Sequence, residues 1–209
     1  MTAIARMPLT ANRLKKQLEN EDIIFVPASI EDYWKLVESP QLRLDYFNHQ
    51  IVATMSYGSV RHETIVSNVH GFFFNAFVGK FRLFASNRPV FAADCGDIFN
   101  PDVHLVAGEL DEYAYKRSKT ATLNPKIVVE VMSTSTKEFD LVNKLPCYQK
   151  IDSLQHIVYI EQDFAEIMLY SRTNNSDEWL LQRFNSMENT FKLLDKTFSL
   201  QNIYRDIEF

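Results

Sequence analysis

The segment PKIVVEVMSTSTKEFDLVNK, residues 125–144, is the most informative part of the sequence for the fold. Its first part, residues 127–132, is an unbroken run of β-branched and other apolar residues except for Glu130. A run without polar alternation predicts a strand that is covered on both faces, as central strands of α/β sheets are. An unpaired carboxylate there would be costly. We therefore expect Glu130 to have a partner, either a bound cation or a buried salt bridge with Lys126 or Lys144.

The stretch NPDVHLV, residues 100–106, supplies a second carboxylate. Asp102 follows Pro101 at the start of an expected strand, a position where the missing N–H of proline costs little. If this strand neighbours the strand that carries Glu130, both carboxylates reach one end of the sheet. Oxygen ligands of this kind suit Mg²⁺ or Mn²⁺. The alternative is an aspartate that only caps the strand.

A lysine follows on the next expected helix. Lys144 lies four residues after Asp140, so their side chains share one helix face, and Tyr148 continues that face. This spacing predicts an ammonium group near the two acids. The alternative is an exposed Asp140–Lys144 pair, which would contribute only about 0.3–0.5 kcal/mol.

The rest of the chain predicts an α/β domain around a mixed sheet. We expect a loose arm over residues 1–20 and a single domain over residues 21–209. Ser29 and Asp32 predict a capped helix that stops before Pro40. The other expected elements are a hairpin at 43–55 turning at Asn48-His49, helices at 60–77 and 140–150, strands at 81–86, 89–94, 101–107, 126–132, 156–161, 166–172 and 179–184, and a short closing element at 199–209. Residues 107–124 read as a long polar connection, a candidate substrate-facing loop.

Composition narrows the class of protein. The 209 residues are 46% hydrophobic and 23% charged, which is ordinary for a soluble globular protein. No apolar stretch approaches a membrane span, and the N-terminus lacks a secretory h-region. Cys95 and Cys147 lack metal-site spacing, so we expect reduced thiols in a cytoplasmic protein, with disulfide pairing as the alternative.

Charge is unevenly distributed along the chain. The formal net charge is −5, yet residues 114–150 carry seven basic residues against three acidic ones. Such a segment either faces phosphate or forms solvated faces. Glycines are scattered singly, so a nucleotide-dependent enzyme with a Gly-rich phosphate loop is not expected.

The order of motifs resembles the Uma-two (Uma2) family, whose fold is restriction-endonuclease-like, of the PD-(D/E)XK type. The resemblance covers roughly residues 28–205 and is most specific in PDVHLVA and in IVVEVMSTSTKEFDLVNKLPCYQK. It implies a mixed central sheet flanked by helices. It also implies that Asp102, Glu130 and Lys144 are catalytic, that Asp102, Glu130 and the Val131 carbonyl bind Mg²⁺ or Mn²⁺, and that the protein is an endonuclease that hydrolyses phosphodiester bonds of nucleic acid, with DNA favoured.

Several residues have two possible roles. By the same resemblance Asp45 and His62 are accessory site residues, although Asp45 also suits a surface position and His62 a helix cap. Ser133 and Ser135 either contact phosphate or cap the next helix. We expect the run Phe72-Phe73-Phe74 in the core or in the interface of a homodimer, with a base-stacking platform as the alternative.

A second function class stays open. Met132 stands where the general nuclease pattern has its lysine, Pro146 falls inside the expected helix, and the chain is acidic overall. These features favour a catalytically inactive nuclease fold that serves as a binding or interaction module.

Overall fold

The computed structural model describes residues 8–55, 58–116, 118–175 and 177–209. The chain divides into two compact units, Met1–Tyr57 and Gly58–Phe209. Within the described residues, no helix combines the length and the apolar character that crossing a bilayer requires. The single domain expected over residues 21–209 stays a prediction.

The smaller unit contains two helices and a three-stranded antiparallel sheet in the order β1–β3–β2. Its elements are α1 (Ala11–Leu18), β1 (Ile23–Pro27), α2 (Ile30–Leu36), β2 (Leu42–Phe47) and β3 (Gln50–Met55). The capping box predicted at α2 is confirmed, because the Ser29 side chain accepts from the Asp32 N–H and the Asp32 carboxylate accepts from the Ser29 N–H.

The structure differs from the expected loose arm at helix α1. Thr10 caps this helix, and Leu14 and Leu18, four residues apart, are buried on one face. Residues 1–7 of the expected arm lie outside the described residues.

The β2–β3 hairpin turns at Asn48-His49, as predicted. Both residues have left-handed backbones, with φ of 48° and 60°. Two successive residues with positive φ form the type I′ turn whose twist matches that of a two-residue hairpin. Asparagine tolerates this region better than most residues, so the turn forms without the usual glycine.

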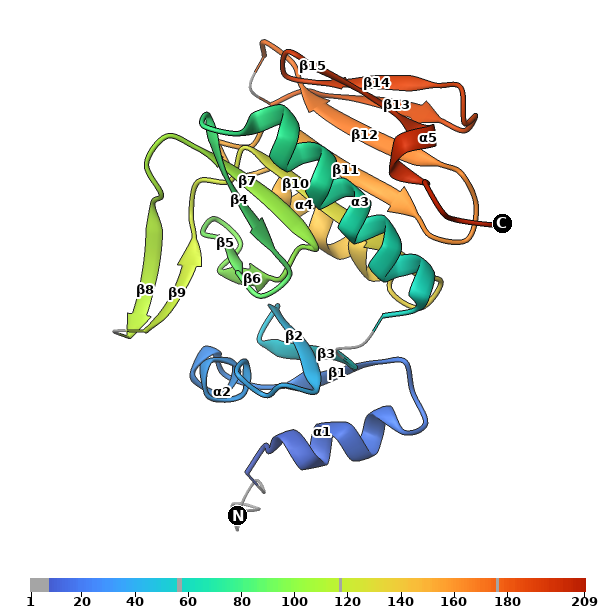
Figure 1. The fold of residues 1–209 in the computed structure, drawn as a ribbon. Coiled ribbons are helices and arrows are strands. Elements are labelled where there is room, and N and C mark those ends of the chain that lie inside the picture. The colour runs from blue at the N-terminus through green and yellow to red at the C-terminus, as the bar shows by residue number, and fades with distance from the viewer. Residues whose placement is uncertain (1–7, 56–57, 117, 176) are drawn as a thin grey trace. The chain divides into compact units, whose positions relative to one another are not determined.

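The larger unit is built on a six-stranded sheet in the order β13–β12–β11–β10–β7–β4 (Figure 1). β10 and β11 are parallel and the other neighbours are antiparallel, so the predicted mixed sheet is confirmed. The sheet strands are β4 (Phe81–Ala85), β7 (Val103–Ala107), β10 (Ile127–Met132), β11 (His156–Glu161), β12 (Ile167–Arg172) and β13 (Trp179–Phe184). The other elements of this unit are α3 (Val60–Phe77), β5 (Val90–Ala92), β6 (Asp97–Phe99), β8 (Glu112–Lys116), β9 (Lys119–Thr122), η1 (Phe139–Lys144), α4 (Leu145–Tyr148), β14 (Thr190–Leu193), β15 (Lys196–Ser199) and α5 (Leu200–Ile203).

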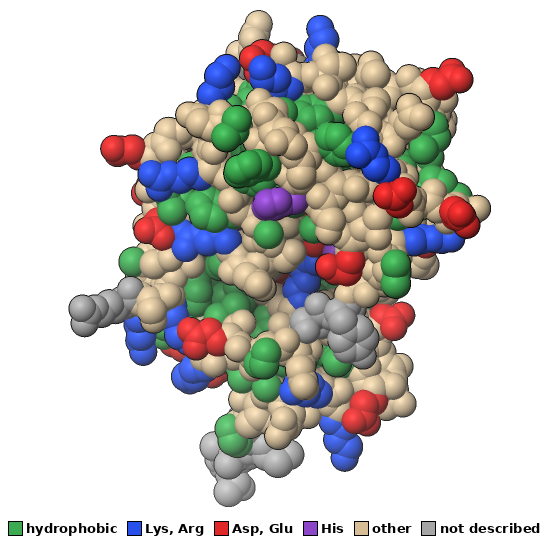
Figure 2. Space-filling view, in the orientation of Figure 1, with side chains coloured by type: hydrophobic (Ala, Val, Ile, Leu, Met, Phe, Trp, Pro, Cys, Tyr) green, Lys and Arg blue, Asp and Glu red, His purple; other side chains and the backbone are tan. Residues whose placement is uncertain are grey.

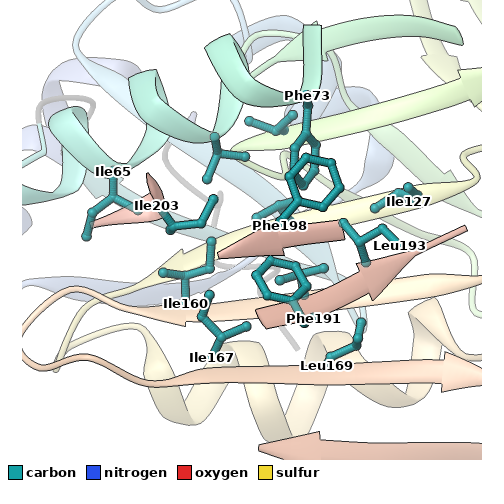
Figure 3. Close-up of a cluster of buried hydrophobic side chains, with 14 of the residues drawn as sticks. Ile65, Phe73, Ile127, Ile160, Ile167, Leu169, Phe191, Leu193, Phe198 and Ile203 are labelled. Carbon is teal, nitrogen blue, oxygen red and sulfur yellow. The ribbon is translucent and has the colours of Figure 1, made fainter. Parts of the chain in front are cut away.

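One face of the sheet carries the hydrocarbon core. Alternate residues of β7 and β10 pack there against α3, the β14–β15 hairpin and α5 (Figure 3). Phe73 of α3 and Phe198 of β15 meet with ring centroids 4.8 Å apart. The opposite face of β10 is covered by η1 and α4, which lie on the other side of the sheet from α3 in Figure 1. Because side chains alternate along a strand, the residues between the core positions face η1 and α4.

The expectation that residues 107–124 form a long connection without structure of its own is wrong, because β8 and β9 within this range pair as an antiparallel hairpin. Arg88 fixes it: the guanidinium donates to Glu112 Oε1 and to Thr120 Oγ1, each at 2.6 Å. The ring of Tyr113 packs on Phe91 of β5, with centroids 4.4 Å apart. These contacts make an ordered hairpin of this segment, and a substrate-facing role for it stays a prediction.

The prediction of two reduced thiols is also wrong. Cys95, in the turn between β5 and β6, is joined by a disulfide to Cys147 of α4, with Cα atoms 5.9 Å apart. The two residues are 52 positions apart, and only the packing of the β5–β6 turn beside α4 brings them together. Sequence spacing therefore carried no signal for this pairing. The cytoplasmic location inferred partly from these thiols stays a prediction.

Figure 2 shows that basic and acidic side chains are interspersed over the viewed face of the larger unit. Of the basic residues in 114–150, Lys144 is buried inside the protein.

Candidate active site

Asp102 and Glu130 lie opposite each other on the face of the sheet that η1 and α4 cover. β10 pairs with β7 in the register Val129↔Val103 and Val128↔His104. One step further, this antiparallel register places Glu130 opposite Asp102. Directly opposed residues point to the same face, with Cβ atoms about 5 Å apart. Both carboxylates are inaccessible, with 1% of Asp102 and 2% of Glu130 exposed.

The backbone of β10 holds Asp102 in place. The Val131 N–H donates to Asp102 Oδ2 at 2.7 Å, just beyond the last paired residues of β7. In an extended strand the N–H and C=O of one residue point to the same side. The Val131 carbonyl therefore also points toward the side of Asp102, as a carbonyl ligand at this site would have to.

Lys144 reaches Glu130 from a π-helical turn. The Leu145 N–H donates to the Asp140 carbonyl, five residues back, so η1 is wider than an α-helix. Pro146, expected to disturb this helix, stands at the start of α4 directly after that turn. In an α-helix, a proline ring clashes with the carbonyl four residues before it. Here the turn that precedes Pro146 is the wider π-helical turn of η1. Such π turns recur at functional sites.

The Lys144 ammonium is buried between two carboxylates. Its Nζ lies 3.1 Å from Glu130 Oε1 and 2.9 Å from Asp140 Oδ1, and only 4% of the side chain is exposed. The predicted pairing of Lys144 with Glu130 is confirmed, whereas the alternative of an exposed Asp140–Lys144 pair is wrong. Removing one partner of such a buried group leaves an uncompensated charge, which costs about 3–5 kcal/mol.

Two tyrosines complete the network around Glu130. The Tyr148 hydroxyl donates to Glu130 Oε1 at 2.8 Å, the same oxygen that Lys144 contacts. Tyr159, opposite Glu130 on β11, donates to the Asp140 carbonyl at 2.9 Å. Burial, and then the charges of Asp140 and Glu130, raise the pKa of Tyr159 well above its usual value, so it stays a neutral donor.

His62 lies in the first turn of α3 and reaches one of the site acids, Asp102. Its Nε2 is 3.5 Å from Asp102 Oδ2 and its Nδ1 is 3.2 Å from Glu63 Oε1. The His62 N–H also donates to the Ser59 side chain, which caps the helix. The structure therefore brings His62 to the site and gives it a place in the helix cap at the same time.

Three further residues were predicted near the site. Asp45 is buried on β2 of the smaller unit, so the alternative of a surface aspartate is wrong, and its accessory role stays a prediction. Ser133 and Ser135 bond to each other at 3.0 Å, and Ser133 Oγ accepts from the Thr136 N–H in the turn before η1. Since η1 itself has no side-chain cap, capping of that helix is not confirmed, and a phosphate contact stays a prediction.

Asp140 and Tyr148 are the site residues that the sequence analysis did not commit to. Their spacing from Lys144, four residues on either side, was the available signal, because such residues share a helix face. The spacing did not tell whether that face was buried. That depends on Glu130 lying beneath it.

Oxygen atoms dominate the donor set of this site. Asp102, Glu130 and Asp140 contribute carboxylates, and Lys144 contributes one ammonium. Two carboxylates and a backbone carbonyl suit a small hard cation such as Mg²⁺, which commonly binds through one or two carboxylates. The residues present therefore fit a divalent cation.

Comparison with known proteins identifies the family of this chain. The Uma2 family model, described as "Putative restriction endonuclease", matches residues 30–201. Two uncharacterised proteins of Synechocystis sp. (strain ATCC 27184 / PCC 6803 / Kazusa) are similar. The protein slr1290 is 27% identical over 187 residues, 88% of this chain and 95% of its own length. The protein sll1609 is 30% identical over 102 residues, 49% of this chain and 56% of its own length. The family match spans most of the chain, including all of β7, β10 and η1, and the chain therefore belongs to the Uma2 family.

Proposed function

We propose that this protein is a metal-dependent endonuclease that hydrolyses phosphodiester bonds, with DNA as the favoured substrate. One observation carries the proposal: Asp102 and Glu130 stand opposite each other at the end of the β7–β10 ladder, with the Lys144 ammonium 3.1 Å from Glu130. Family membership supports nuclease chemistry, and the acid–acid–lysine set supports this site as its location.

Each residue has a specific part in this proposal. Asp102, Glu130 and the Val131 carbonyl would hold Mg²⁺ or Mn²⁺, which when bound polarises a phosphate and lowers the pKa of its water. The Val131 N–H fixes the Asp102 carboxylate, and the Tyr148 hydroxyl fixes Glu130. Lys144 supplies a positive charge to stabilise the negative charge that builds on the phosphorane.

Cleavage of plasmid, single-stranded DNA and single-stranded RNA in Mg²⁺ or Mn²⁺ tests this function. We expect nicking or linearisation of DNA by the wild type, and a loss of at least about 100-fold in Asp102→Asn and in Glu130→Gln. Asp195→Asn, which alters an exposed ion pair with Lys80, is the matched control and should cleave normally. Thermal unfolding of each variant shows that it is folded.

Two results would contradict the proposal. Activity that survives in both acid variants would place catalysis elsewhere. Cleavage that proceeds equally in a chelator would remove the metal requirement. A preference for RNA would keep the site and change only the substrate.

A binding module without turnover is the second candidate. Met132, buried two residues after Glu130, occupies the position of the usual catalytic lysine, and Lys144 is already engaged by two carboxylates. Calorimetric titration with Mn²⁺ separates the candidates. An enzyme should bind the ion in a way that Glu130→Gln abolishes, whereas a module should bind nucleic acid without cleaving it and without taking up the ion.

A homodimer and a cytoplasmic location complete the proposal. Phe73 belongs to the core of the larger unit, but Phe74 beside it is 55% exposed on α3. Sedimentation velocity of the wild type and of Phe74→Ser tests the dimer: a dimer through this helix should dissociate in the variant.

A further inference from the structure

A second cluster of metal-ligating side chains lies at the β5–β6 turn and α4. Cys95, Asp97 and Cys147 place one ligand atom each within 4.8 Å of one another. Asp97 and Cys147 are buried and Cys95 is half-buried. These three side chains belong to the larger unit and form a ligand set of two sulfurs and one carboxylate.

The turn geometry explains why these residues converge. Cys95 and Asp97 flank Gly96, whose φ of +72° is one that residues with a Cβ rarely adopt. The N–H groups of Cys95 and Gly96 both donate to the Ala92 carbonyl at 3.0 Å, which closes the turn. The closed turn brings the Cys95 sulfur and the Asp97 carboxylate next to Cys147 on α4.

The contact between Asp97 and Cys147 fits a reduced sulfur better than a disulfide. Asp97 Oδ2 lies 3.5 Å from Cys147 Sγ, a hydrogen-bonding distance for a thiol. A disulfide sulfur carries no hydrogen and cannot donate. The carboxylate thus sits where a thiol, or a cation bound to the thiolate, would interact with it favourably.

We propose that Cys95, Asp97 and Cys147 form a redox-gated site for a thiolate-binding divalent cation of the Zn²⁺ class. Zn–S and Zn–O bonds of about 2.3 and 2.1 Å in a tetrahedron put sulfur and oxygen about 3.6 Å apart. The Asp97–Cys147 separation of 3.5 Å matches this value. The sulfurs would move to about 3.8 Å from each other, through side-chain rotation.

The chemistry switches between two states of the same sulfurs. A dithiol gives two electrons and two protons to the disulfide and becomes a disulfide itself, leaving two thiols on the chain. Binding of the cation by both thiolates then releases those two protons. In the reverse exchange, a small-molecule disulfide takes two electrons from the two thiolates and is cleaved to two thiolates, which take up two protons. The Cys95–Cys147 disulfide forms again, both thiolate ligands are lost and the ion is released. Soft sulfur ligands distinguish this site from the all-oxygen set at Asp102 and Glu130.

Co²⁺ added to reduced protein tests the site directly, because cobalt bound to thiolate absorbs in the near ultraviolet and visible. The full chain is reduced with a dithiol, freed of it without oxygen, and titrated. We expect a thiolate-to-cobalt band in the wild type that Zn²⁺ bleaches, no band in Cys95→Ser or Cys147→Ser, and at least about tenfold weaker binding in Asp97→Asn. Glu130→Gln, at the oxygen site, should keep the band.

A second measurement protects the test against misfolded variants. In the reduced wild type, Zn²⁺ should slow alkylation of both thiols, and disulfide formation should abolish the cobalt band. A reduced wild type without a band, or a band that survives Cys95→Ser, would overturn the proposal. Neither readout depends on DNA cleavage, so this site and the nuclease site can fail separately.

Discussion

Strand β10 buries Val129 against α3 on one face and Glu130 against η1 and α4 on the other. Both side chains are sealed from water, but the first face is filled with hydrocarbon and the second with hydrogen-bonded charges. Burial alone therefore does not distinguish the hydrophobic core from the candidate site. The two faces of β10 differ in the side chains that cover them. On the Glu130 face, the polar groups of Lys144, Asp140 and Tyr148 are buried together with hydrogen-bonding or ionic partners.

The largest expected effect comes from placing a charge on the apolar face. Val129→Asp would bury a carboxylate among hydrocarbon side chains and remove a packed one, and we expect it to lower the unfolding free energy by at least about 4 kcal/mol. Chemical denaturation measures the loss. Leu180→Asp, at an exposed position of β13, is the matched control and should change stability by about 0.5 kcal/mol or less.

Lys144→Met removes the positive charge from the charged face of β10. It leaves Glu130 and Asp140 without their shared ammonium, so we expect a loss of about 3–5 kcal/mol. Adding Asp140→Asn to Lys144→Met should restore part of the lost unfolding free energy, because the double variant has one uncompensated carboxylate fewer. Lys196→Met, which alters an exposed pair with Asp195, should cost about 0–1 kcal/mol. Equal losses at the two lysines would show that the buried network is not stabilising.

His104 sharpens the comparison because it shares the polar face of β7 yet carries no charge. Burial, and then the nearby Arg88, lower its pKa from 6.5 to about 3. Between pH 6.5 and about 3, His104 is therefore protonated in the unfolded chain but neutral in the folded protein. The free energy of unfolding decreases as the pH falls from 6.5 toward 3. This slope is up to about 1.4 kcal/mol per pH unit.

Denaturation of the wild type and His104→Gln between neutral and acidic pH measures this term. The variant cannot titrate at this position, so we expect its stability to fall less steeply with acid. Parallel curves would mean that the pKa of His104 is the same in the folded and the unfolded protein.

Much of the fold could be predicted because local sequence specifies it strongly. The apolar run of β10 required burial on both faces, and Asn48-His49 between two strands required a tight hairpin. The pairing of Asp102 with Glu130 followed once the two strands were taken as neighbours. In each of these cases the signal lies within a few residues.

What could not be predicted depends on contacts between distant segments. The β8–β9 ribbon is polar on its exposed side and is held by Arg88, about 30 residues away, so its composition resembles a loop. The disulfide and the burial of Asp140 likewise arise only when elements pack. The short β14 and β15 strands were missed for a different reason: they are neighbours in sequence, but each has four residues, too few for a clear strand pattern.

The smallest expected effect isolates one hydrogen bond on the charged face. Tyr148→Phe keeps the ring, which packs edge-on against Phe99 with centroids 5.2 Å apart, and removes only the hydroxyl that donates to Glu130. A hydrogen bond to a charged acceptor contributes about 1.5 kcal/mol or somewhat more, so we expect a loss of that size by chemical denaturation. In a Glu130→Gln background the same change should cost less, since the acceptor is then neutral, and the difference between the two costs is the coupling energy. Tyr170→Phe, on the partly exposed part of β12, controls for the loss of a hydroxyl as such. A zero coupling energy would mean that Tyr148 packs beside Glu130 without orienting it.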